Sequence, residues 1–222
     1  MNKYKSFFIL LLLSNSLTAG ADVLSDKEIM SQRSLGNPDS KITIYNYFSI
    51  DSKYSRDFYL REFPKLKKNY IYTGKIHYVM TDVGGSSKAE MANLLARCAS
   101  PKDEYFTLFD VYFRKWDYWN EKLKEYKSSI LKGDTKGCWS SGNCFTLQND
   151  EMKRLAHETT SMSRHDVSQC LDNRSVSDDL KWRRPKIQGT PFFAIEIDGK
   201  RVAEQLGYIP YSVLSQFIDA EL

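Results

Sequence analysis

The nine residues Tyr47-Phe48-Ser49-Ile50-Asp51-Ser52-Lys53-Tyr54-Ser55 mark the point where one predicted element passes directly into another. The residues before the break, 41–48, are mostly β-branched or aromatic and predict a strand. In the residues after it, apolar side chains recur at roughly helical spacing, which predicts a helix over 53–68. Pro64 lies inside that helix and removes a backbone donor, so we expect a kink there. A strand followed at once by a helix is typical of an α/β chain.

The rest of the chain places a block of helices between two segments that contain strands. Strands are predicted at 75–83, 192–197 and 201–205, the last two joined by an Asp198-Gly199 turn. Helices are predicted at 87–99, 102–116, 118–131, 148–158 and 163–172, with Ser163 as an N-cap and a Gly-rich loop at 133–146. A last helix from Pro210 to Ala220 is expected to bury Val213, Leu214 and Phe217. This order predicts one sheet domain interrupted by a helical insertion.

Residues 1–21 have the pattern of a secretory signal peptide. Two lysines precede an unbroken apolar run at 7–13, and small residues follow it. The run is too short to cross a bilayer, so we expect cleavage before Asp22 and no stable membrane insertion afterwards. The prediction is export to a periplasmic or other extracytoplasmic compartment, where disulfides are permitted. Residues 22–40 are polar and are predicted to form an N-terminal arm.

Composition excludes several classes of protein. Of the 222 residues, 41% are hydrophobic and 14% are aromatic, which is too apolar for a disordered chain. The formal net charge of +4 is not concentrated in one stripe, so it does not argue for nucleic acid. The chain has no phosphate-binding loop and no dinucleotide motif, and its His and Cys residues lack the spacing of metal ligands. We therefore predict no cofactor and no metal site.

Four segments of the chain together resemble the DsbA-like branch of the thioredoxin-fold thiol:disulfide oxidoreductases. They are Gly36-Asn37-Pro38, the nine residues 47–55, Phe63-Pro64-Lys65-Leu66 and Ile187-Gln188-Gly189-Thr190-Pro191-Phe192-Phe193. The resemblance implies a thioredoxin-like α/β fold with a central mixed sheet, formed by residues 41–86 and 187–222. It also implies that residues 87–186 form an inserted helical domain.

The resemblance places the family's reactive Cys-x-x-Cys pair on Ser52 and Ser55. Thiol exchange needs a thiolate activated at a helix N-terminus and a second sulfur that resolves the mixed disulfide. A serine hydroxyl supplies neither, and the sequence near it shows no base with an orienting partner for serine catalysis. We therefore expect Ser52 or Ser55 to cap the helix and the site to be redox-inactive. The sequence leaves open whether the serines are natural or were substituted for cysteines.

The resemblance also implies that Thr190-Pro191 is a cis peptide facing Ser52. In thioredoxin-like proteins the residue before this proline offers its backbone to an extended peptide, in the manner of strand addition. The leading hypothesis is an exported protein that binds extended or unfolded polypeptide without a covalent step, in a chaperone-like or assembly role. A purely structural or surface-interaction role is a further hypothesis.

Four cysteines lie between residues 98 and 170 and allow three pairings. The resemblance implies a non-catalytic disulfide between Cys98 and Cys170. Cys138 and Cys144 lie in one Gly/Ser-rich segment, close enough in sequence to close a small ring. The alternative function, a thiol:disulfide oxidoreductase, requires either that the serines replace a Cys-x-x-Cys pair or that Cys138 and Cys144 form a second redox pair. The predicted loop lacks the helix N-terminus that would activate such a pair.

Overall fold

The computed structural model describes residues 33–84, 86–117, 143–173 and 187–222. The predicted signal peptide, most of the predicted arm, the helix predicted at 118–131 and Cys138 lie outside these ranges. No helix within them is long and apolar enough to cross a membrane.

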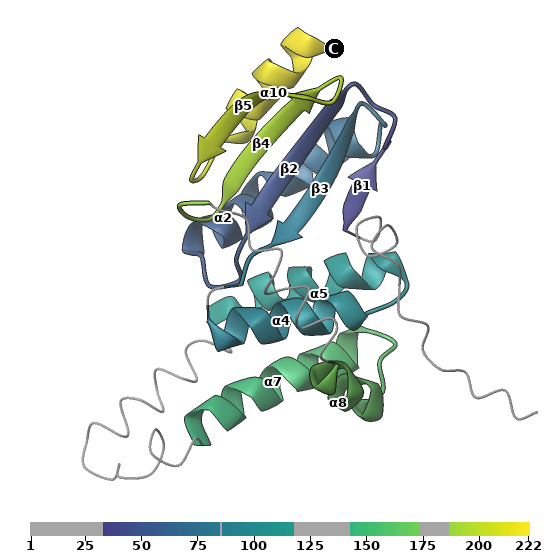
Figure 1. Cartoon of the computed structure of the whole chain (residues 1–222), viewed down its shortest axis with the longest axis vertical. Helices are drawn as coiled ribbons and strands as arrows, with labels where there is room; N and C mark the ends of the chain where they lie inside the picture. The colour runs from purple at the N-terminus through teal and green to yellow at the C-terminus, as the bar shows by residue number, and fades with distance from the viewer. Residues whose placement is uncertain (1–32, 85, 118–142, 174–186) are drawn as a thin grey trace, which may run out of the picture.

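Five strands form one mixed sheet in the order β1-β3-β2-β4-β5 (Figure 1). The strands are β1 (Ser34–Gly36), β2 (Ile42–Phe48), β3 (Ile76–Asp82), β4 (Phe192–Ile197) and β5 (Lys200–Leu206). The central strand β2 runs parallel to β3 and antiparallel to β4, so that Ile44 lies opposite Tyr78 on one side and Ile195 on the other. All three side chains are buried, and they form the middle of the sheet's core.

Strand β1 lies in the segment that was expected to be a polar arm. It pairs antiparallel with β3, which places Gly36 opposite His77. Gly36 has a φ of +86°, and a Cβ built on it would lie 2.2 Å from the Ile76 carbonyl oxygen, so only glycine fits there. Three residues are too few for an alternating pattern, so sequence periodicity does not reveal this strand.

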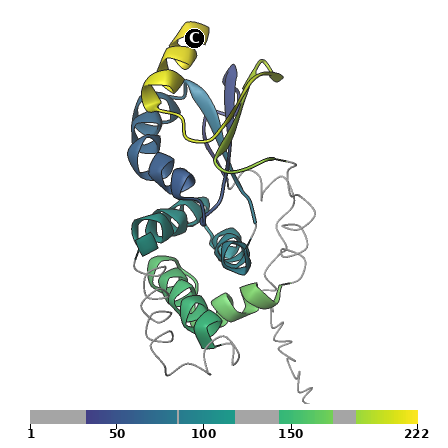
Figure 2. The same cartoon turned by 90° about the vertical axis from the view of Figure 1, so that its left-hand side faces the viewer.

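Helices cover one face of the sheet (Figure 2). They are α2 (Lys53–Arg61), α3 (Phe63–Leu66), the π-helix η1 (Lys67–Ile71) and α10 (Tyr211–Glu221). The helical run breaks at Glu62, because Pro64 cannot donate to the Leu60 carbonyl and its ring crowds that group. The expected kink is therefore present, although the run continues to Ile71 instead of ending at residue 68.

The buried face of α10 differs from the prediction at one position. Leu214 and Ile218 are buried, and Phe217 packs partly buried beside them. Val213 is instead 51% exposed. The i, i+4 spacing of Leu214 and Ile218 sets the inward direction of the helix, and Val213 lies about 100° around the axis from Leu214.

Four helices gather at one end of the sheet (Figure 1). They are α4 (Ser87–Cys98), α5 (Lys102–Arg114), α7 (Asn143–Thr159) and α8 (Arg164–Asp172). Aromatic side chains of α5 form much of their core, namely Tyr105, Phe106, Phe109, Tyr112 and Phe113. Phe109 meets Phe48 of β2 edge to face with 4.7 Å between ring centroids, which joins this core to that of the sheet.

The boundaries of α7 differ from the prediction, whereas the start of α8 agrees with it. Helix α8 begins after Ser163, whose hydroxyl accepts from the Asp166 N–H in a capping box. Helix α7 begins at Asn143, five residues before the predicted start, so the predicted loop at 133–146 is wrong at its C-terminal end. The Gly and Ser residues there favour a loop only through local propensity, which is a weak guide to where a packed helix begins. Cys144 therefore lies in the first turn of α7.

Candidate functional site

The junction between β2 and α2 places Ser52 at the N-cap of α2. Its side-chain oxygen accepts a hydrogen bond from the Ser55 N–H at 3.2 Å. The same hydroxyl donates to the Thr190 carbonyl oxygen at 2.7 Å. Ser52 therefore caps the helix and also joins it to the loop that precedes β4.

Ser55, one turn further along α2, is buried. Its hydroxyl accepts from the Ser49 N–H at 3.3 Å, and the Ser52 N–H donates to the Ser49 carbonyl at 3.1 Å. These two bonds close the turn between β2 and α2. The two serines thus differ in access, since Ser52 is partly exposed and Ser55 is enclosed by the protein.

The loop before β4 presents the backbone of Thr190. The Thr190-Pro191 peptide is cis, and the Pro191 carbonyl accepts from the Gly207 N–H at 2.8 Å, just beyond β5. Within the part of the chain that the structure describes, no group accepts a hydrogen bond from the Thr190 N–H. Within the described ranges, the Thr190 carbonyl accepts from the Ser52 hydroxyl.

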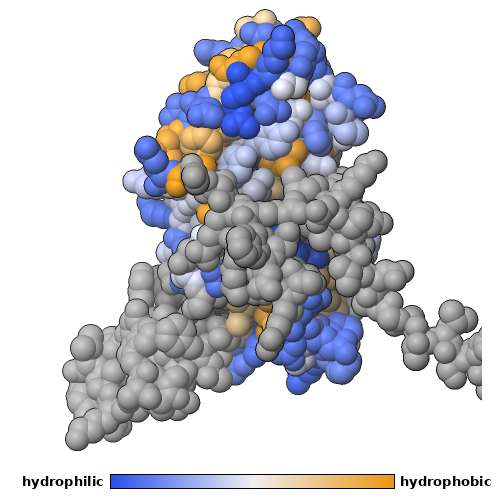
Figure 3. Space-filling model, viewed as in Figure 1, coloured by the Kyte–Doolittle hydropathy of each residue, from blue (hydrophilic) through white to orange (hydrophobic). Residues whose placement is uncertain are grey.

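Two exposed apolar side chains belong to the elements on either side of this contact. Tyr54, in the first turn of α2, is 61% exposed, and Leu206, the last residue of β5, is 45% exposed. Leu206 lies 3.5 Å from where a Cβ on Gly189 would be, which places it against the loop before β4. Figure 3 shows apolar surface over the β4–β5 hairpin at the end nearer α2. The surface around Thr190 therefore combines backbone donors and acceptors with apolar side chains.

Side chains of the inserted helices anchor the turn that carries Ser52. The Asp51 carboxylate accepts from the Ser86 hydroxyl and pairs with Lys88 at 3.1 Å, at the start of α4. The Trp116 indole N–H donates to the Ile50 carbonyl at 3.0 Å. These residues were not expected from the sequence, because the contacts join positions 35 and 66 residues apart and no motif marks them.

Comparison with known proteins shows the family to which this chain belongs. The family model described as Thioredoxin matches residues 29–220, which include both strand-containing segments and the inserted helices. The chain is a member of the thioredoxin family.

Solved structures share the fold of this thioredoxin-family protein. α-DsbA1 from Wolbachia pipientis superposes with a TM-score of 0.65 at 20% identity, over 85% of this chain and 89% of that chain. A protein-disulfide isomerase from Novosphingobium aromaticivorans gives the same TM-score and identity, over 85% of this chain and 95% of that chain. The expected DsbA-like thioredoxin fold, an α/β fold with a mixed sheet and a helical insertion, is confirmed.

Two curated relatives from Rickettsia carry the name "Putative protein-disulfide oxidoreductase". The protein from Rickettsia prowazekii is 30% identical over 169 residues, which are 72% of this chain and 53% of the relative. The protein from Rickettsia bellii is 34% identical over 98 residues, which are 43% of this chain and 38% of the relative. The chain therefore spans about half the length of these relatives, or less.

Within the described part of this thioredoxin-family chain, no base is hydrogen-bonded to Ser52. Among the described residues, the Ser52 hydroxyl is hydrogen-bonded only to the Ser55 N–H and the Thr190 carbonyl, and to no imidazole or carboxylate. The three histidines lie apart on β3, α7 and α8. In the described ranges, no group of three or more His, Cys, Asp or Glu side chains is placed to hold a metal ion. The described contacts of Ser52 are therefore those of a helix cap and of a bond to the loop before β4.

The cysteines that the structure describes lie in α4, α7 and α8. Cys98 and Cys170 form the expected disulfide, which joins α4 to α8 across 72 residues of sequence. Cys144 is the second residue of α7 and so belongs to a helix N-terminus. The expectation that no helix N-terminus adjoins this cysteine is therefore wrong. Cys138, and with it the expected Cys138–Cys144 ring, lies outside the described residues.

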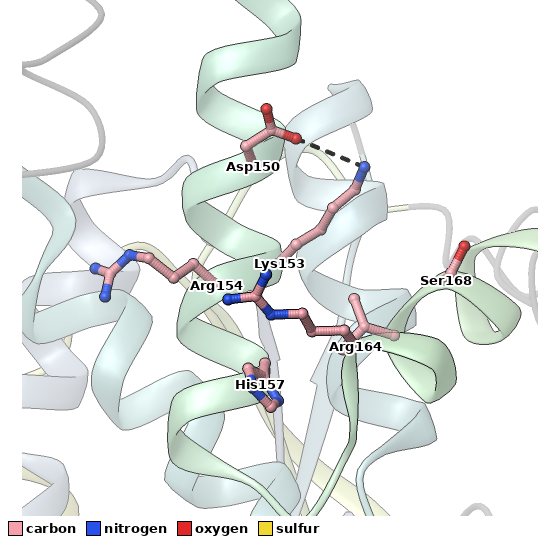
Figure 4. A pocket seen from close by; sticks show the side chains of 7 residues that line it. Asp150, Lys153, Arg154, His157, Arg164 and Ser168 are labelled. Atoms are coloured by element: carbon pink, nitrogen blue, oxygen red, sulfur yellow. Dashed lines mark ion pairs between the residues drawn. The ribbon is translucent and has the colours of Figure 1, made fainter.

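A pocket of about 370 Å³ opens between α7 and α8 (Figure 4). Its polar lining consists of Asp150, Lys153, Arg154, His157, Arg164 and Ser168. Lys153 pairs with Asp150 at 3.8 Å, and Arg154 pairs with Glu151 and Glu158, so α7 neutralises much of its own positive charge. The pocket contains none of the residues around Ser52.

Proposed function

We propose that this protein binds extended or unfolded polypeptide beside Thr190 without a covalent step at Ser52, in a chaperone-like or assembly role. The observation that carries the proposal is the 2.7 Å hydrogen bond from the Ser52 hydroxyl to the Thr190 carbonyl. Through this bond, the neutral Ser52 hydroxyl contacts the Thr190 backbone, which is the group that would pair with a peptide. A hydroxyl cannot form a disulfide with a client, so binding is the step that this geometry supports.

Backbone pairing would supply most of the affinity. The Thr190 N–H is available as a donor, and the bonds from Ser52 and Gly207 hold its loop in place before any peptide arrives. Each new hydrogen bond contributes about 0.5–1.5 kcal/mol net, so a few of them give weak and reversible association. Exposed Tyr54 and Leu206 favour clients that expose apolar side chains.

An extracytoplasmic location is part of the proposal. The Cys98–Cys170 disulfide supports it, because such bonds persist in oxidising compartments and are rare in the cytosol. The signal-peptide pattern of residues 1–21 supports the same location.

A second candidate function is thiol:disulfide exchange through Cys138 and Cys144. The names of the Rickettsia relatives favour it, and so does the position of Cys144 in the first turn of α7. In this reaction a client dithiol would reduce a Cys138–Cys144 disulfide in two exchange steps, and the client would leave with the disulfide.

Oxidation of a dithiol peptide in glutathione buffer separates the two candidates. We expect the wild-type chain to oxidise the peptide dithiol no faster than the glutathione buffer does alone. The Ser52→Cys/Ser55→Cys variant is expected to gain exchange activity, since its sulfurs would lie at the N-terminus of α2. Activity of the wild-type chain that disappears in Cys138→Ser/Cys144→Ser would establish the second candidate and contradict a redox-inactive protein.

A further inference from the structure

Positive charge is concentrated in the helical run that follows Ser52. Residues 53–75 contain seven Lys and Arg against two Asp and Glu, a net charge of +5, whereas the whole chain has +4. The remaining residues together carry a net charge of −1. The expectation that charge is not concentrated in one stripe is therefore wrong for this segment.

Five of these cations lie toward the far end of the run, from the end of α2 to the turn before β3. They are Arg61, Lys65, Lys67, Lys68 and Lys75, and we call the surface that they form the lysine face. Arg61, Lys65 and Lys68 follow the i, i+4, i+7 spacing of one helix face, and all three are exposed. The run lies along the outer side of the molecule in Figure 2.

Two acids near the lysine face, Glu62 and Asp219, are bound mainly by groups outside it. Glu62 is buried, and its carboxylate accepts from the Tyr208 hydroxyl, from the Tyr211 N–H at 3.1 Å and from Lys65 at 3.2 Å. Asp219, on the adjacent helix α10, accepts from the Tyr70 hydroxyl at 2.8 Å. The positive field of the lysine face is therefore only partly offset.

An exposed aromatic side chain lies within the lysine face. Tyr72 is 70% exposed, and the Lys67 ammonium lies 5.5 Å from its ring centroid. A tyrosine flanked by lysines is the composition found where proteins meet the headgroup region of a bilayer.

We propose that the lysine face docks the protein on a surface of anionic phospholipid. Four of its five cations are lysines, whose compact charges do not fix a bidentate geometry as arginine does, and this suits a diffuse layer of headgroups better than a structured partner. The choice of a bilayer over a nucleic acid rests on the extracytoplasmic location proposed above.

Docking in this way would leave Ser52 accessible. At a rise of about 1.5 Å per residue, Lys67 lies about 20 Å along the helical run from Ser52. The end of the run that carries Ser52 and Thr190 would therefore stand away from the headgroups.

Sedimentation with vesicles tests the docking proposal. Wild-type protein should bind vesicles of phosphatidylcholine with phosphatidylglycerol at low salt. It should not bind vesicles of phosphatidylcholine alone, and high salt should abolish binding to the anionic vesicles. Each cation near an anionic surface contributes about fivefold to binding, so Lys65→Gln/Lys67→Gln/Lys68→Gln should weaken it roughly 100-fold.

A charge-matched control removes three exposed cations outside the lysine face, as Lys115→Gln/Arg164→Gln/Lys200→Gln. This variant should bind the anionic vesicles within about twofold of wild type, and circular dichroism should show that both variants are folded. Absence of wild-type binding, an equal loss in the control, or tighter binding to a single-stranded oligonucleotide than to the vesicles would overturn the proposal. None of these outcomes depends on whether peptide binds at Thr190.

Discussion

Ser52 makes two hydrogen bonds that serve different parts of the fold. One satisfies the Ser55 N–H in the first turn of α2, and the other reaches the Thr190 carbonyl before β4. Both bonds are local to one hydroxyl, so a single substitution removes them together. Ser52 is thus the residue at which the stability of α2 and the position of the loop before β4 are coupled.

Replacing Ser52 by alanine should lower the free energy of unfolding by about 1–2 kcal/mol. Loss of an N-cap hydroxyl costs about 1 kcal/mol, and loss of the bond to Thr190 adds a comparable amount. Urea unfolding measures the change, with Ser52→Thr as the control that keeps a hydroxyl. An alanine variant as stable as wild type would show that neither bond contributes.

Asp82 provides a second prediction at the scale of single residues. It is fully buried, and it pairs with Arg97 at 2.9 Å and with Arg33 at 3.2 Å. Burial alone would raise the pKa of Asp82, but the two guanidinium groups hold that pKa below its usual value. Asp82→Asn would leave two buried cations without their carboxylate, which should cost about 3–5 kcal/mol of unfolding free energy.

The pH dependence of this contribution has a definite sign. Because the pKa of Asp82 is lower in the folded state, its contribution is present above the unfolded pKa of about 4 and is lost as the pH falls below it. Urea unfolding of wild type and Asp82→Asn, near neutral pH and in acid, should therefore give a difference that shrinks in acid. Asp110→Asn, which removes an exposed pair with Arg114, should cost less than about 1 kcal/mol. Equal losses from the two substitutions would contradict the account.

At the scale of elements, Glu62 joins the break between α2 and α3 to the segment that leads into α10. Its carboxylate accepts from the Tyr208 hydroxyl and from the Tyr211 N–H at 3.1 Å. The hydrogen bond to Glu62 raises the pKa of Tyr208 to about 12. The same carboxylate therefore ties the start of α10 to the residue between α2 and α3 and raises the pKa of Tyr208.

Glu62→Gln should lower the pKa of Tyr208 toward its ordinary value near 10 and cost about 1–2 kcal/mol of unfolding free energy. The ultraviolet absorbance of tyrosinate measures the first effect when wild type and variant are titrated side by side. In a Tyr208→Phe background, Glu62→Gln should change the titration curve little. The Tyr208 transition is identified as the one that disappears in Tyr208→Phe. If that transition stays near pH 12 in Glu62→Gln, the hydrogen bond to Glu62 is not what raises the pKa of Tyr208.

Sequence patterns predict elements well where the signal is periodic or chemically specific. The Asp198-Gly199 turn, the kink near Pro64 and the Ser163 cap each depend on a few adjacent residues, and each is present. Strand β1 and the start of α7 depend on pairing and packing with distant segments. Local propensity does not contain that information, so the sequence alone could not place them.

At the scale of the whole molecule, the Cys98–Cys170 disulfide limits the freedom of the unfolded insertion. It closes a span of 72 residues, for which chain entropy gives a stabilisation of about 4 kcal/mol. Cys98→Ala/Cys170→Ala should lose an amount of this order in urea unfolding. A Cys138–Cys144 disulfide would close a much shorter span. Cys138→Ala/Cys144→Ala should therefore lose less unfolding free energy. The reverse order of losses would contradict this account.

Some contacts of the candidate site could be predicted from the sequence, and others could not. Ser52, Thr190 and Pro191 lie in motifs that resemble a family, so their meeting was expected from the sequence. The Asp51–Lys88 ion pair and the hydrogen bond from Trp116 to the Ile50 carbonyl form only through the tertiary fold. The lysine face is visible in the sequence only when charge is counted over residues 53–75 in place of the whole chain.

The most direct test of the account is a nuclear magnetic resonance titration with an extended peptide that contains apolar residues and no cysteine. Non-covalent capture predicts a saturable, reversible shift of the Thr190 amide signal, because that N–H would pair with the peptide backbone. The same shift should occur in Cys138→Ser/Cys144→Ser. Peptide binding that leaves the Thr190 amide unchanged, or no binding without a cysteine in the peptide, would contradict non-covalent capture at this site.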